Sequence, residues 1–425
     1  MDMLLSWWKL FEGNNYHEGA SMSTTLLYHM YNIRGYRQRS IKFVPGGVEI
    51  AIEQPRERIV CPICQSEEII LKGKTTRRFV APPIGSKRVT IVFDVPRIEC
   101  RQCWALQQVA VPFARPRRRC IRAFESYVLD LLQSMTCEDV AKHLGVSWGR
   151  IREIEAEHLR RKYEKPRLKD VTHIAIDEIA VRKGHKYMTV VLDLDSGRVI
   201  FVGDGRGGDA LDPFWKRLRR SGATIRAVAA DMSPAYAAAI EAALPDAILV
   251  FDRFHLIKLF NEKLTALRRR LYREMTDRGE RSALKGARWI LLKRPENLNP
   301  ESSEPQRLAR ALASNADLAT AYFLKEELSE IWEQDEYDEA EGMLKDWIEF
   351  AESLEIKEMR DFAKTLRRHA LGILAYYDCE ITTGPLEGLN NKIKTMKRQA
   401  YGFRDMEYFK LKILGIHQAR YALLG

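Results

Sequence analysis

The hydrophobic residues of this chain change their period along its length. Between residues 61 and 103 they alternate with polar residues, as in the run RVTIVF at 88–93, which is typical of β-strands. Between residues 124 and 154 they recur every three or four positions, the period of amphipathic helices. The pattern predicts a strand-rich segment followed by a helical one.

From residue 171 onward, short apolar runs alternate with helical segments. The first three runs predict an antiparallel meander, because Asp195-Ser-Gly197 between the second and third is a good turn. Two further runs follow, each after a helical segment, so the predicted order is β-β-β-α-β-α-β. The five runs are 172–177, 187–192, 199–202, 225–231 and 247–252, and the helical segments are 209–220 and 235–243. Residues 254–370 have almost only helical periodicity.

The composition indicates a basic, globular protein. A chain of 425 residues is long enough for two or three domains. It carries 69 Lys and Arg against 58 Asp and Glu, a formal net charge of +11, which favours a polyanionic partner. A hydrophobic fraction of 46% excludes wholesale disorder, and seven cysteines are too few for a disulfide scaffold. These cysteines indicate a reducing compartment.

No apolar stretch reaches the roughly 18 residues that a membrane span requires. The run MLLSWWKLF at 3–11 contains Lys9, follows Asp2 and lacks a cleavage site of small residues, so we do not expect a signal peptide. We therefore expect a cytoplasmic protein with no membrane partner. Met22 is an alternative start, in which case residues 1–21 would not belong to the native chain.

Four cysteines form two C-x-x-C pairs, Cys61/Cys64 and Cys100/Cys103, with 35 residues between the pairs. Two thiolates from each pair can reach one tetrahedral Zn²⁺ at about 2.3 Å, and such a closed set of four sulfurs is typical of a structural zinc site. The interval exceeds the usual spacing of about 15 to 20 residues, which indicates an inserted hairpin in a zinc ribbon. Reduced core cysteines and two separate redox pairs are the alternative interpretations.

Residues 135–154 have the pattern of a helix-turn-helix. One apolar face is followed by Gly145 at the turn, by Ser147 as the cap of the second helix, and by Ile151 and Ile154 on a second face. The start of such a second helix meets the major groove of DNA, and the arginines before it favour phosphate contacts. The predicted contacts are Arg115, Arg117, Arg118 and Arg119 to phosphates and Ser147, Trp148, Arg150 and Arg152 to bases. A helical hairpin within a larger bundle is the alternative.

Asp177 and Asp231 each end an apolar run, so both would lie at the edge of a core and near one another if their strands are neighbours. Two carboxylates about 4 Å apart repel by roughly 4 kcal/mol at an effective dielectric constant of 20. Mg²⁺ resolves that repulsion, because it prefers hard oxygen ligands and is commonly held by one or two carboxylates and substrate phosphates. Helix caps or partners of arginine are the alternative roles for strand-end acids.

A third acid, Glu387, lies at the start of a predicted helix that follows Thr382-Thr-Gly-Pro385. Glu387 and Asn391 share a face at the i, i+4 spacing, with Asn390 and Lys394 close by. Carboxylate, amide and cationic groups on one face suit a phosphodiester, and we predict that Asn391 and Lys394 contact DNA. The alternative is an ordinary amphipathic helix exposed to solvent.

Asp252 and His255 lie at the end of the last apolar run and in the segment after it. They either support the acidic site without binding metal, or act as a helix cap and a core histidine. Glu178 would point to the opposite face from Asp177 if the strand continues, so we do not expect it to be a ligand.

These motifs together resemble the bacterial insertion-sequence transposases of the ISL-three family, over nearly everything after residue 40. The segments that match are Ala175-Ile-Asp-Glu178, Ala229-Ala-Asp-Met-Ser233, Phe251-Asp-Arg-Phe-His-Leu256, Thr382 to Lys394 and Ala400-Tyr-Gly-Phe-Arg404. The resemblance implies a zinc ribbon and a helix-turn-helix before a ribonuclease-H-like domain with a DDE triad. Asp177, Asp231 and Glu387 would be its three acids, holding two Mg²⁺ (or Mn²⁺) ions, with a helical insertion before the last.

The resulting expectation is a multidomain α+β DNA transposase. Its predicted parts are an N-terminal segment 1–40, a zinc ribbon 41–113, a helix-turn-helix 114–165, a ribonuclease-H-like α/β domain 166–260 with 371–425, and a mostly helical insertion 261–370. It would bind the terminal inverted repeats of its element, cut one strand, and join the 3′-hydroxyl to target DNA. We expect a homodimer or larger assembly on duplex DNA, in the bacterial cytoplasm at the nucleoid. A domesticated DNA-binding regulator and a structure-selective nuclease of the same fold are the rivals.

Overall fold

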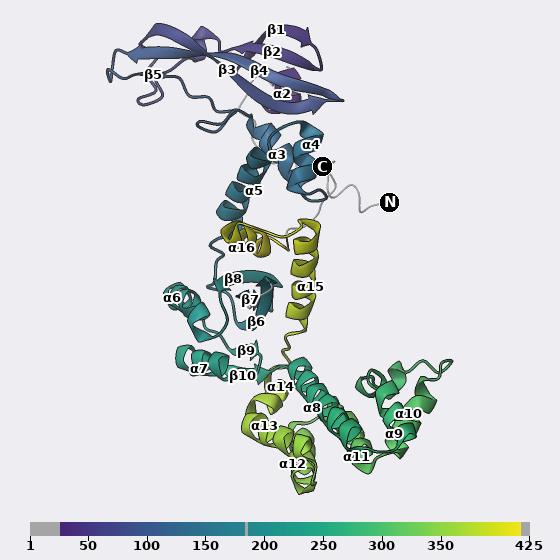
Figure 1. Cartoon of the computed structure of the whole chain (residues 1–425). Coiled ribbons are helices and arrows are strands. Elements are labelled where there is room, and N and C mark those ends of the chain that lie inside the picture. Colours follow the sequence, from purple (N-terminus) through teal and green to yellow (C-terminus); the bar gives the residue numbers. More distant parts are fainter. Residues whose placement is uncertain (1–25, 183–185, 418–425) are drawn as a thin grey trace, which may run out of the picture. The chain divides into compact units, whose positions relative to one another are not determined.

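The computed structural model describes residues 26–182 and 186–417, and the chain divides between residues 157 and 158 into two compact units (Figure 1). The first unit contains a β-sheet and a group of helices, and the second contains another sheet and most of the helices. The expectation about Met22 and residues 1–21 lies outside the described residues. No helix in the described ranges is long and apolar enough to cross a membrane.

The first unit is built on a five-stranded sheet of order β1-β2-β4-β3, with β5 paired to β4. Its strands are β1 Arg37–Val44, β2 Gly47–Glu53, β3 Ile69–Ile84, β4 Lys87–Cys100 and β5 Leu106–Gln108. The two long strands β3 and β4 form an antiparallel hairpin between the two cysteine pairs, which confirms the predicted inserted hairpin. Alternate residues of β4 are buried, including Val89, Ile91, Phe93 and Val95, because the strand covers a core on one face only.

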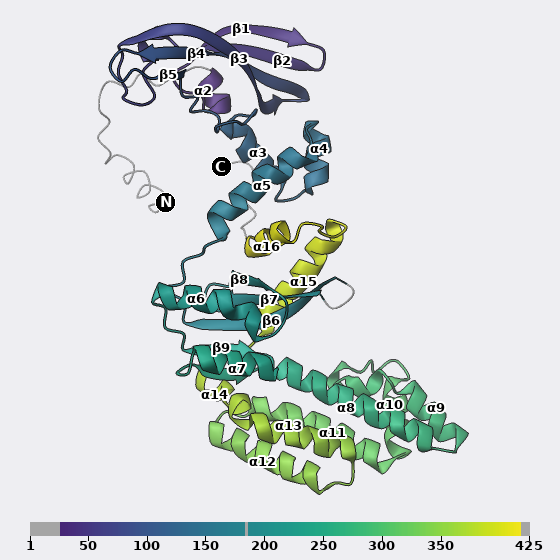
Figure 2. The same ribbon diagram turned by 60° about the vertical axis from the view of Figure 1, so that its left-hand side comes forward.

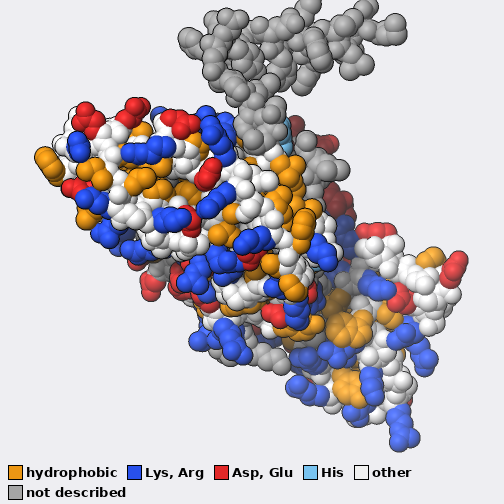
Figure 3. All heavy atoms as spheres, turned by 90° about the horizontal axis from the view of Figure 1, so that it is seen from above, with side chains coloured by type: hydrophobic (Ala, Val, Ile, Leu, Met, Phe, Trp, Pro, Cys, Tyr) orange, Lys and Arg blue, Asp and Glu red, His pale blue; other side chains and the backbone are white. Residues whose placement is uncertain are grey.

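The core under this sheet also includes residues from α2 (Leu26–Tyr31) and the following turn, namely Leu27, Tyr31, Ile33 and Tyr36. On the exposed side, Lys74 pairs with Asp94 at 2.7 Å and Lys72 pairs with Glu99 at 2.7 Å. Figure 3, a view from above, shows Lys and Arg mixed with Asp, Glu and hydrophobic side chains. Much of the positive charge of the sheet is therefore offset locally.

Three helices complete the first unit: α3 Arg122–Leu131, α4 Cys137–Leu144 and α5 Trp148–Tyr163, whose last turns pass into the second unit. Thr136 caps α4 by accepting a hydrogen bond from the Asp139 N–H at 3.2 Å, and Gly145 ends it with a φ of 60°. Four hydrophobic residues bury the facing sides of α4 and α5: Val140, Ala141, Leu144 and Ile151. The predicted helix-turn-helix is confirmed.

The second unit contains a five-stranded sheet of order β10-β9-β6-β7-β8. Strands β6, β7 and β8 pair in an antiparallel meander, and β6, β9 and β10 run parallel. The elements are β6 His173–Arg182, β7 Lys186–Asp193, β8 Arg198–Asp204, η2 Gly208–Leu211, α6 Asp212–Ser221, β9 Ala227–Ala230, α7 Pro234–Ala243 and β10 Ile248–Phe251. This order confirms the predicted β-β-β-α-β-α-β arrangement.

Helices cover both faces of this sheet (Figures 1 and 2). On one face Phe214 of α6 and Tyr236 of α7 pack with Ile176 of β6. On the other face Leu389 of α15 (Gly384–Gln399) and Phe409 of α16 (Met406–Leu414) pack with Val190 of β7. Because both faces are covered, β7 is continuously buried from Met188 to Asp193, and β6 is buried from Ile174 to Ile176.

A long helical segment joins β10 to α15 and has its own core. Its helices are α8 Arg253–Glu274, α9 Arg278–Gly286, α10 Glu304–Ala313, α11 Ala316–Glu330, α12 Tyr337–Ser353, α13 Lys357–Leu374 and α14 Tyr376–Cys379. Phe260, Trp347 and Phe362 pack edge to face, with ring centroids 5.0 to 6.0 Å apart. The proposed boundaries at 260/261 and 370/371 fall inside α8 and α13, so these helices pass from one part to the other without a break.

Candidate active site

The four cysteines of the two C-x-x-C pairs converge on one point. Sγ of Cys61 lies 3.5 Å from Sγ of Cys103, Sγ of Cys64 lies 3.5 Å from Sγ of Cys100, and all four sulfurs lie within 4.8 Å of one another. A tetrahedron with zinc–sulfur bonds of about 2.3 Å requires sulfurs about 3.8 Å apart, so the cluster fits Zn²⁺. The backbone N–H of Cys64 lowers the pKa of Cys61 to about 6, which favours the thiolate that binds metal.

The two cysteine loops have the same backbone design. The residue after each pair, Gln65 or Trp104, has a positive φ, 63° or 58°, and donates its N–H to the first cysteine carbonyl of its loop. This turn lets both cysteines of a pair face the same point. The repeated geometry supports one shared zinc site.

The arginine cluster before the helix-turn-helix divides into two groups. Arg115 and Arg118 are held inside the first unit by carboxylates, since Arg115 Nε lies 2.7 Å from Glu125 and Arg118 Nη2 lies 2.6 Å from Glu157. Arg117 and Arg119 are exposed. Arg115 and Arg118 thus fasten α3 and α5 to the preceding loop, and the expected phosphate contacts of the four arginines stay a prediction.

The start of α5 presents an exposed aromatic and basic surface. Trp148 is 46% exposed, and the Arg152 guanidinium lies 5.7 Å from the centre of its ring. Ser147 is exposed just before the helix, and Arg150 is partly buried. These side chains occupy the position at which a recognition helix presents residues to DNA.

The first two acids of the predicted triad lie at neighbouring positions of the sheet. Ile176 of β6 pairs with Ala230 of β9 in parallel register, so Asp177 and Asp231 each follow the last paired residue. This confirms that their strands are neighbours. The expectation that Asp177 ends its strand is wrong, however, because β6 continues to Arg182 and only β9 stops.

Asp177 is largely buried and tightly held. Its Oδ1 accepts the Glu178 N–H at 2.7 Å, and its Oδ2 accepts from Asn390 Nδ2 of α15 at 2.7 Å. Burial raises the pKa of Asp177, and these hydrogen bonds, together with the nearby His255, offset part of the rise. The other amide atom, Asn390 Oδ1, is buried without a hydrogen-bond partner among the described residues.

Glu387 is exposed in the first turn of α15, between Thr383 and Asn390. Among the residues that the structure describes, only the four cysteines bring three or more potential ligand atoms within 4.8 Å of one another. The carboxylate of Glu387 therefore does not form such a cluster with Asp177 and Asp231. Burial raises the pKa of Glu178, and Asp177 and Asp231 contribute to that shift, so Glu178 lies in the same electrostatic field.

Asp252 links the last strand of the sheet to the start of α15. It caps α8 by accepting the Phe254 N–H at 3.2 Å, and its Oδ2 also accepts from Thr383 and contacts His255 Nδ1 at 3.0 Å. Burial alone would raise the pKa of Asp252, but the bonds from His255 and Thr383 outweigh it and lower the pKa. The interpretation of Asp252 as a helix cap is confirmed, and its support of the acidic site stays a prediction.

Sequence reasoning missed Thr383, the buried partner of Asp252. The two residues are 131 positions apart, and the only local signal was the Thr-Thr-Gly-Pro entry to the helix. The Asp252 bond also raises the pKa of His255, against burial, and the carboxylates of Asp231 and Asp177 raise it further. A protonated His255 would thus lie among three acids.

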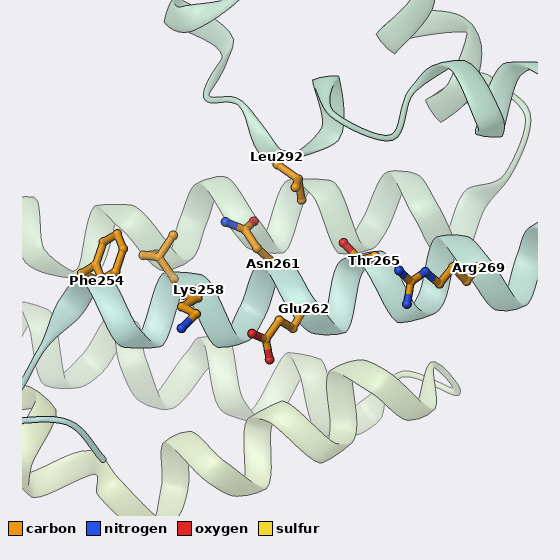
Figure 4. Close-up of a pocket in the computed structure, with 8 residues that line it drawn as sticks. Phe254, Lys258, Asn261, Glu262, Thr265, Arg269 and Leu292 are labelled. Atoms are coloured by element: carbon orange, nitrogen blue, oxygen red, sulfur yellow. The ribbon is translucent and has the colours of Figure 1, made fainter. Parts of the chain in front are cut away.

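A hollow of about 590 Å³ runs along α8, away from these acids (Figure 4). Its lining includes Phe254, Lys258, Asn261 and Arg269 but none of the predicted site residues. The chemistry is instead expected at the edge of β6 and β9, where the carboxylates are.

Three family models match the chain in succession. Residues 57–103 match the zinc-finger of the transposases IS204/IS1001/IS1096/IS1165, residues 109–159 match the helix-turn-helix domain of transposase family ISL3, and residues 174–413 match the DDE transposase model of ISL3. The last match alone covers more than half of the chain. This chain belongs to the ISL3 transposase family.

Two insertion-sequence transposases agree with this assignment. The transposase of insertion sequence element IS1001 from Bordetella parapertussis is 32% identical over 86% of this chain and 90% of its own length. The transposase of element IS1557 from Mycobacterium tuberculosis is 29% identical over 85% of this chain and 86% of its own length. The Drosophila P element transposase strand transfer complex matches with a TM-score of 0.40 and 12% identity, over 69% of this chain and 91% of that chain.

As an ISL3 transposase, the chain is a DNA transposase and therefore a polynucleotidyl transferase. Its helix-turn-helix is a DNA-binding domain, and its zinc ribbon with four converging cysteines is a structural zinc site. The DDE family to which it belongs implies the use of a divalent metal. These statements confirm the predicted family, fold class and function.

Proposed function

We propose that this ISL3 transposase binds the terminal inverted repeats of its element and uses Asp177, Asp231 and Glu387 to hold two Mg²⁺ or Mn²⁺ ions for strand cleavage and transfer. The observation that carries the proposal is the parallel register of Ile176 and Ala230, which brings Asp177 and Asp231 to neighbouring positions. The Asn390–Asp177 hydrogen bond brings α15, the helix of Glu387, to the same edge.

The available donor atoms suit a hard divalent ion. They are carboxylate oxygens, joined by Asn390 Oδ1, a buried acceptor with no partner among the described residues. Mg²⁺ prefers oxygen ligands and retains waters, so a partly open set of acids fits it better than a closed cage. Glu387 is exposed and can approach when metal and DNA neutralise the repulsion between the acids.

Bound metal would supply a Lewis acid for the attacking and leaving oxygens of an in-line displacement. The chain's own residues hold the carboxylates: Asn390 and the Glu178 N–H orient Asp177, and Thr383 holds Asp252. Hydrolysis of one phosphodiester leaves a 3′-hydroxyl, which attacks a target phosphodiester. One P–O bond forms as another breaks, so strand transfer needs no nucleotide energy source.

DNA recognition in this proposal belongs to the first unit and to α15. Phosphates are contacted by Arg115, Arg117, Arg118 and Arg119, of which Arg117 and Arg119 are already exposed, and the start of α5 reads bases in the major groove. The proposed base-reading residues are Ser147, Trp148, Arg150 and Arg152, and the proposed contacts beside the catalytic site are Asn391 and Lys394. We also propose the domain boundaries: a zinc ribbon at 41–113, a helix-turn-helix at 114–165, a catalytic domain at 166–260 with 371–425, and a helical insertion at 261–370.

Two element ends must meet for transposition, so we propose a homodimer or larger assembly on duplex DNA. The place of action is the cytoplasm, at the nucleoid, where that DNA lies.

Asp252 and His255 act as positioning residues in this scheme. Asp252 accepts a hydrogen bond from the Thr383 hydroxyl at the start of α15 and another from the Phe254 N–H at the start of α8. It therefore sets the position of the helix that carries Glu387, while His255 offsets the negative charge of the acids before metal binds.

The test is the substitution Asp231→Asn, which removes a charge without changing the size of the side chain. We expect the variant to bind DNA from the element's ends as tightly as the unaltered chain and to lose strand cleavage in Mg²⁺, by at least about a hundredfold. Gel assays would resolve nicks and strand-transfer products. Normal cleavage by Asp231→Asn would contradict the triad, and the matched variant Asp246→Asn, altered at a carboxylate between α7 and β10, should cleave normally.

A further inference from the structure

The turn between α15 and α16 carries a tyrosine that the catalytic scheme does not use. Tyr401 is 100% exposed and has a φ of 51°, a left-handed conformation that a residue with a large side chain seldom adopts. The turn is closed by the Tyr401 N–H on the Arg398 carbonyl at 3.1 Å and the Gly402 N–H on the Lys397 carbonyl at 2.9 Å. The ring thus projects from a well-formed helix end.

The residues on either side of Tyr401 fasten this turn to the catalytic sheet. Arg182, at the end of β6, donates to the Phe403 carbonyl at 3.0 Å and to the Arg404 carbonyl at 3.4 Å. The Phe403 ring stacks on Phe409 of α16 with centroids 4.5 Å apart. Because contacts with β6 and α16 hold the residues that follow it, Tyr401 lies in a turn that is packed against the catalytic domain.

The surroundings of Tyr401 are basic. The last turns of α15 and the turn itself carry Lys394, Lys397, Arg398 and Arg404, and no described carboxylate lies within 4.0 Å of their charged nitrogens. The nearest acids in sequence have other partners, since Asp405 caps α16 and Glu407 pairs with Lys410 at 2.7 Å. An exposed ring beside cations that have no described carboxylate partner suits a nucleic acid, because the ring can stack on a base while the cations contact phosphates.

We propose that Tyr401 stacks on a base of the element DNA while the cations around it contact the neighbouring phosphates. The proposal rests on the DNA transposase function, because α15 also carries Glu387 at its other end. Fourteen residues separate Glu387 from Tyr401, which is about 21 Å along a helix at 1.5 Å per residue. At 3.4 Å per nucleotide, the base in contact lies about six nucleotides from the bond that is cut.

A stacked base must leave the regular duplex, at least in part, and DNA beside a cleaved end is the place where this costs least. The contact would hold the end of the element in register with the acids while the strand is cut. Because every base has an aromatic face, the contact would be tolerant of sequence and would add to base reading by α5.

The experiment uses the full chain with its zinc bound and without added Mg²⁺ or Mn²⁺, so that binding is measured without chemistry. The probe is a 50-base-pair duplex copied from the terminus of the element that carries this gene, with 2-aminopurine placed singly at positions three to nine from the terminal bond. Three variants are compared with the unaltered chain: Tyr401→Ala, Tyr401→Phe, and Leu371→Ala as a control at another exposed large side chain, 83% exposed on α13.

We expect the unaltered chain, Tyr401→Phe and Leu371→Ala to change the fluorescence at one or two adjacent positions near the sixth. Tyr401→Ala should lose that change and bind about 5- to 150-fold more weakly by anisotropy. Equal fluorescence profiles and affinities for Tyr401→Ala and the unaltered chain would overturn the proposal. A change in oligomeric state with unaltered DNA contacts would also overturn it, in favour of a protein partner.

This outcome is separable from that of the catalytic proposal. Asp231→Asn is expected to bind the probe with the same fluorescence change as the unaltered chain, whereas Tyr401→Ala loses the signal before any cleavage. If the chain bound an unrelated duplex as tightly as the element's end, end recognition would fail, but the loss in Tyr401→Ala would still be expected on that duplex, because stacking does not depend on sequence.

Discussion

Asn390 is the side chain through which α15 contacts Asp177, the first acid of the proposed triad. It donates from Nδ2 to Asp177 at 2.7 Å, while its Oδ1 is buried without a partner among the described residues. An amide in this position orients a carboxylate and offers one more oxygen to a divalent ion. The residue does both only because α15 packs on β6, which sequence spacing alone does not reveal.

We predict that Asn390→Ala lowers the affinity for Mn²⁺ by about 10- to 100-fold, since supporting partners of metal ligands have effects of that size. Isothermal titration of the DNA-free chain measures the affinity directly, and cleavage should fall with it. Thr395→Ala, an exposed position on the same helix, is the control. Unchanged Mn²⁺ binding in Asn390→Ala would remove Asn390 from the site.

The His255–Asp252 pair should make stability depend on pH. The hydrogen bond that His255 donates to Asp252 raises the pKa of His255, so its stabilising contribution is complete below the ordinary histidine value near 6.5 and is lost as the pH rises through the raised value. The pKa of Asp252 is lowered, so its contribution is present above about pH 4 and is lost as the pH falls through the lowered value.

Without added Mg²⁺ or Mn²⁺, the free energy of unfolding of His255→Gln should therefore fall furthest below that of the unaltered chain between about pH 4.5 and 6.5. The difference should shrink above neutral pH, as urea titrations at a series of pH values would show. His369 has the opposite tendency, because burial lowers its pKa, so His369→Gln should not reproduce this profile. A difference that does not vary with pH would rule out a charged His255.

At the scale of elements, unequal strand lengths create the edge of the sheet at which Asp177 and Asp231 lie. β6 has ten residues and β9 has four, so the parallel pairing stops at Ile176 and Ala230 while β6 continues along β7. The backbone of β9 leaves the sheet after Ala230. Asp177 and Asp231 come directly after the last paired residues of their strands. A β6 that ended with β9 would leave Asp177 on a loop, less firmly fixed.

The helical segment is fixed to this sheet by close packing of α13 on β10. A Cβ atom on Gly372 of α13 would lie 2.4 Å from the Phe251 ring, which means that the helix approaches the strand more closely than alanine allows. Gly342 of α12 has nothing within 4 Å of the same position. Alanine substitutions at these two helical glycines can therefore be compared, because only the one at Gly372 would meet a neighbouring side chain.

We predict that Gly372→Ala lowers the free energy of unfolding by about 1 to 3 kcal/mol through overpacking. Gly342→Ala should instead raise it by about 0.5 to 1 kcal/mol, because alanine is the better helix former. Chemical denaturation of both variants measures these changes. Equal effects of the two substitutions would show that α13 and β10 are less tightly packed than the structure indicates.

At the scale of the whole molecule, the chain consists of two units with separate cores and separate tasks. The first unit has the zinc cysteines and the helix-turn-helix, and the second has the acids and the helical segment. Structural zinc contributes roughly 10 kcal/mol or more of binding free energy to small zinc domains, so it should determine the stability of the cysteine loops.

We predict one zinc per chain, and its loss in Cys100→Ser. Hydrogen exchange should then lose protection around both cysteine loops and keep it in the sheet β6–β10, because that sheet has its own core. DNA binding should fall with the zinc content. Cys379→Ser, altered outside the cysteine cluster, should retain the metal. Loss of protection in both units at once would contradict the two separate cores.

The sequence by itself determined the local features of this protein. Two C-x-x-C pairs predicted the zinc cluster, helical spacing around Gly145 predicted the helix-turn-helix, and apolar runs predicted the order of strands and helices. These features follow from the short-range periods of strands and helices and from the ligand geometry of zinc. Family motifs then named the acids.

Tertiary structure decided what each polar residue does. Arg115 and Arg118 have the same sequence context as Arg117 and Arg119, yet only the first two meet carboxylates of α3 and α5. Likewise, nothing near Asp252 in sequence indicated Thr383, 131 positions away. Such pairings depend on how elements distant in sequence pack against one another. Once a polar group is buried, leaving it without a hydrogen bond is costly, so the packing of the fold determines its partner.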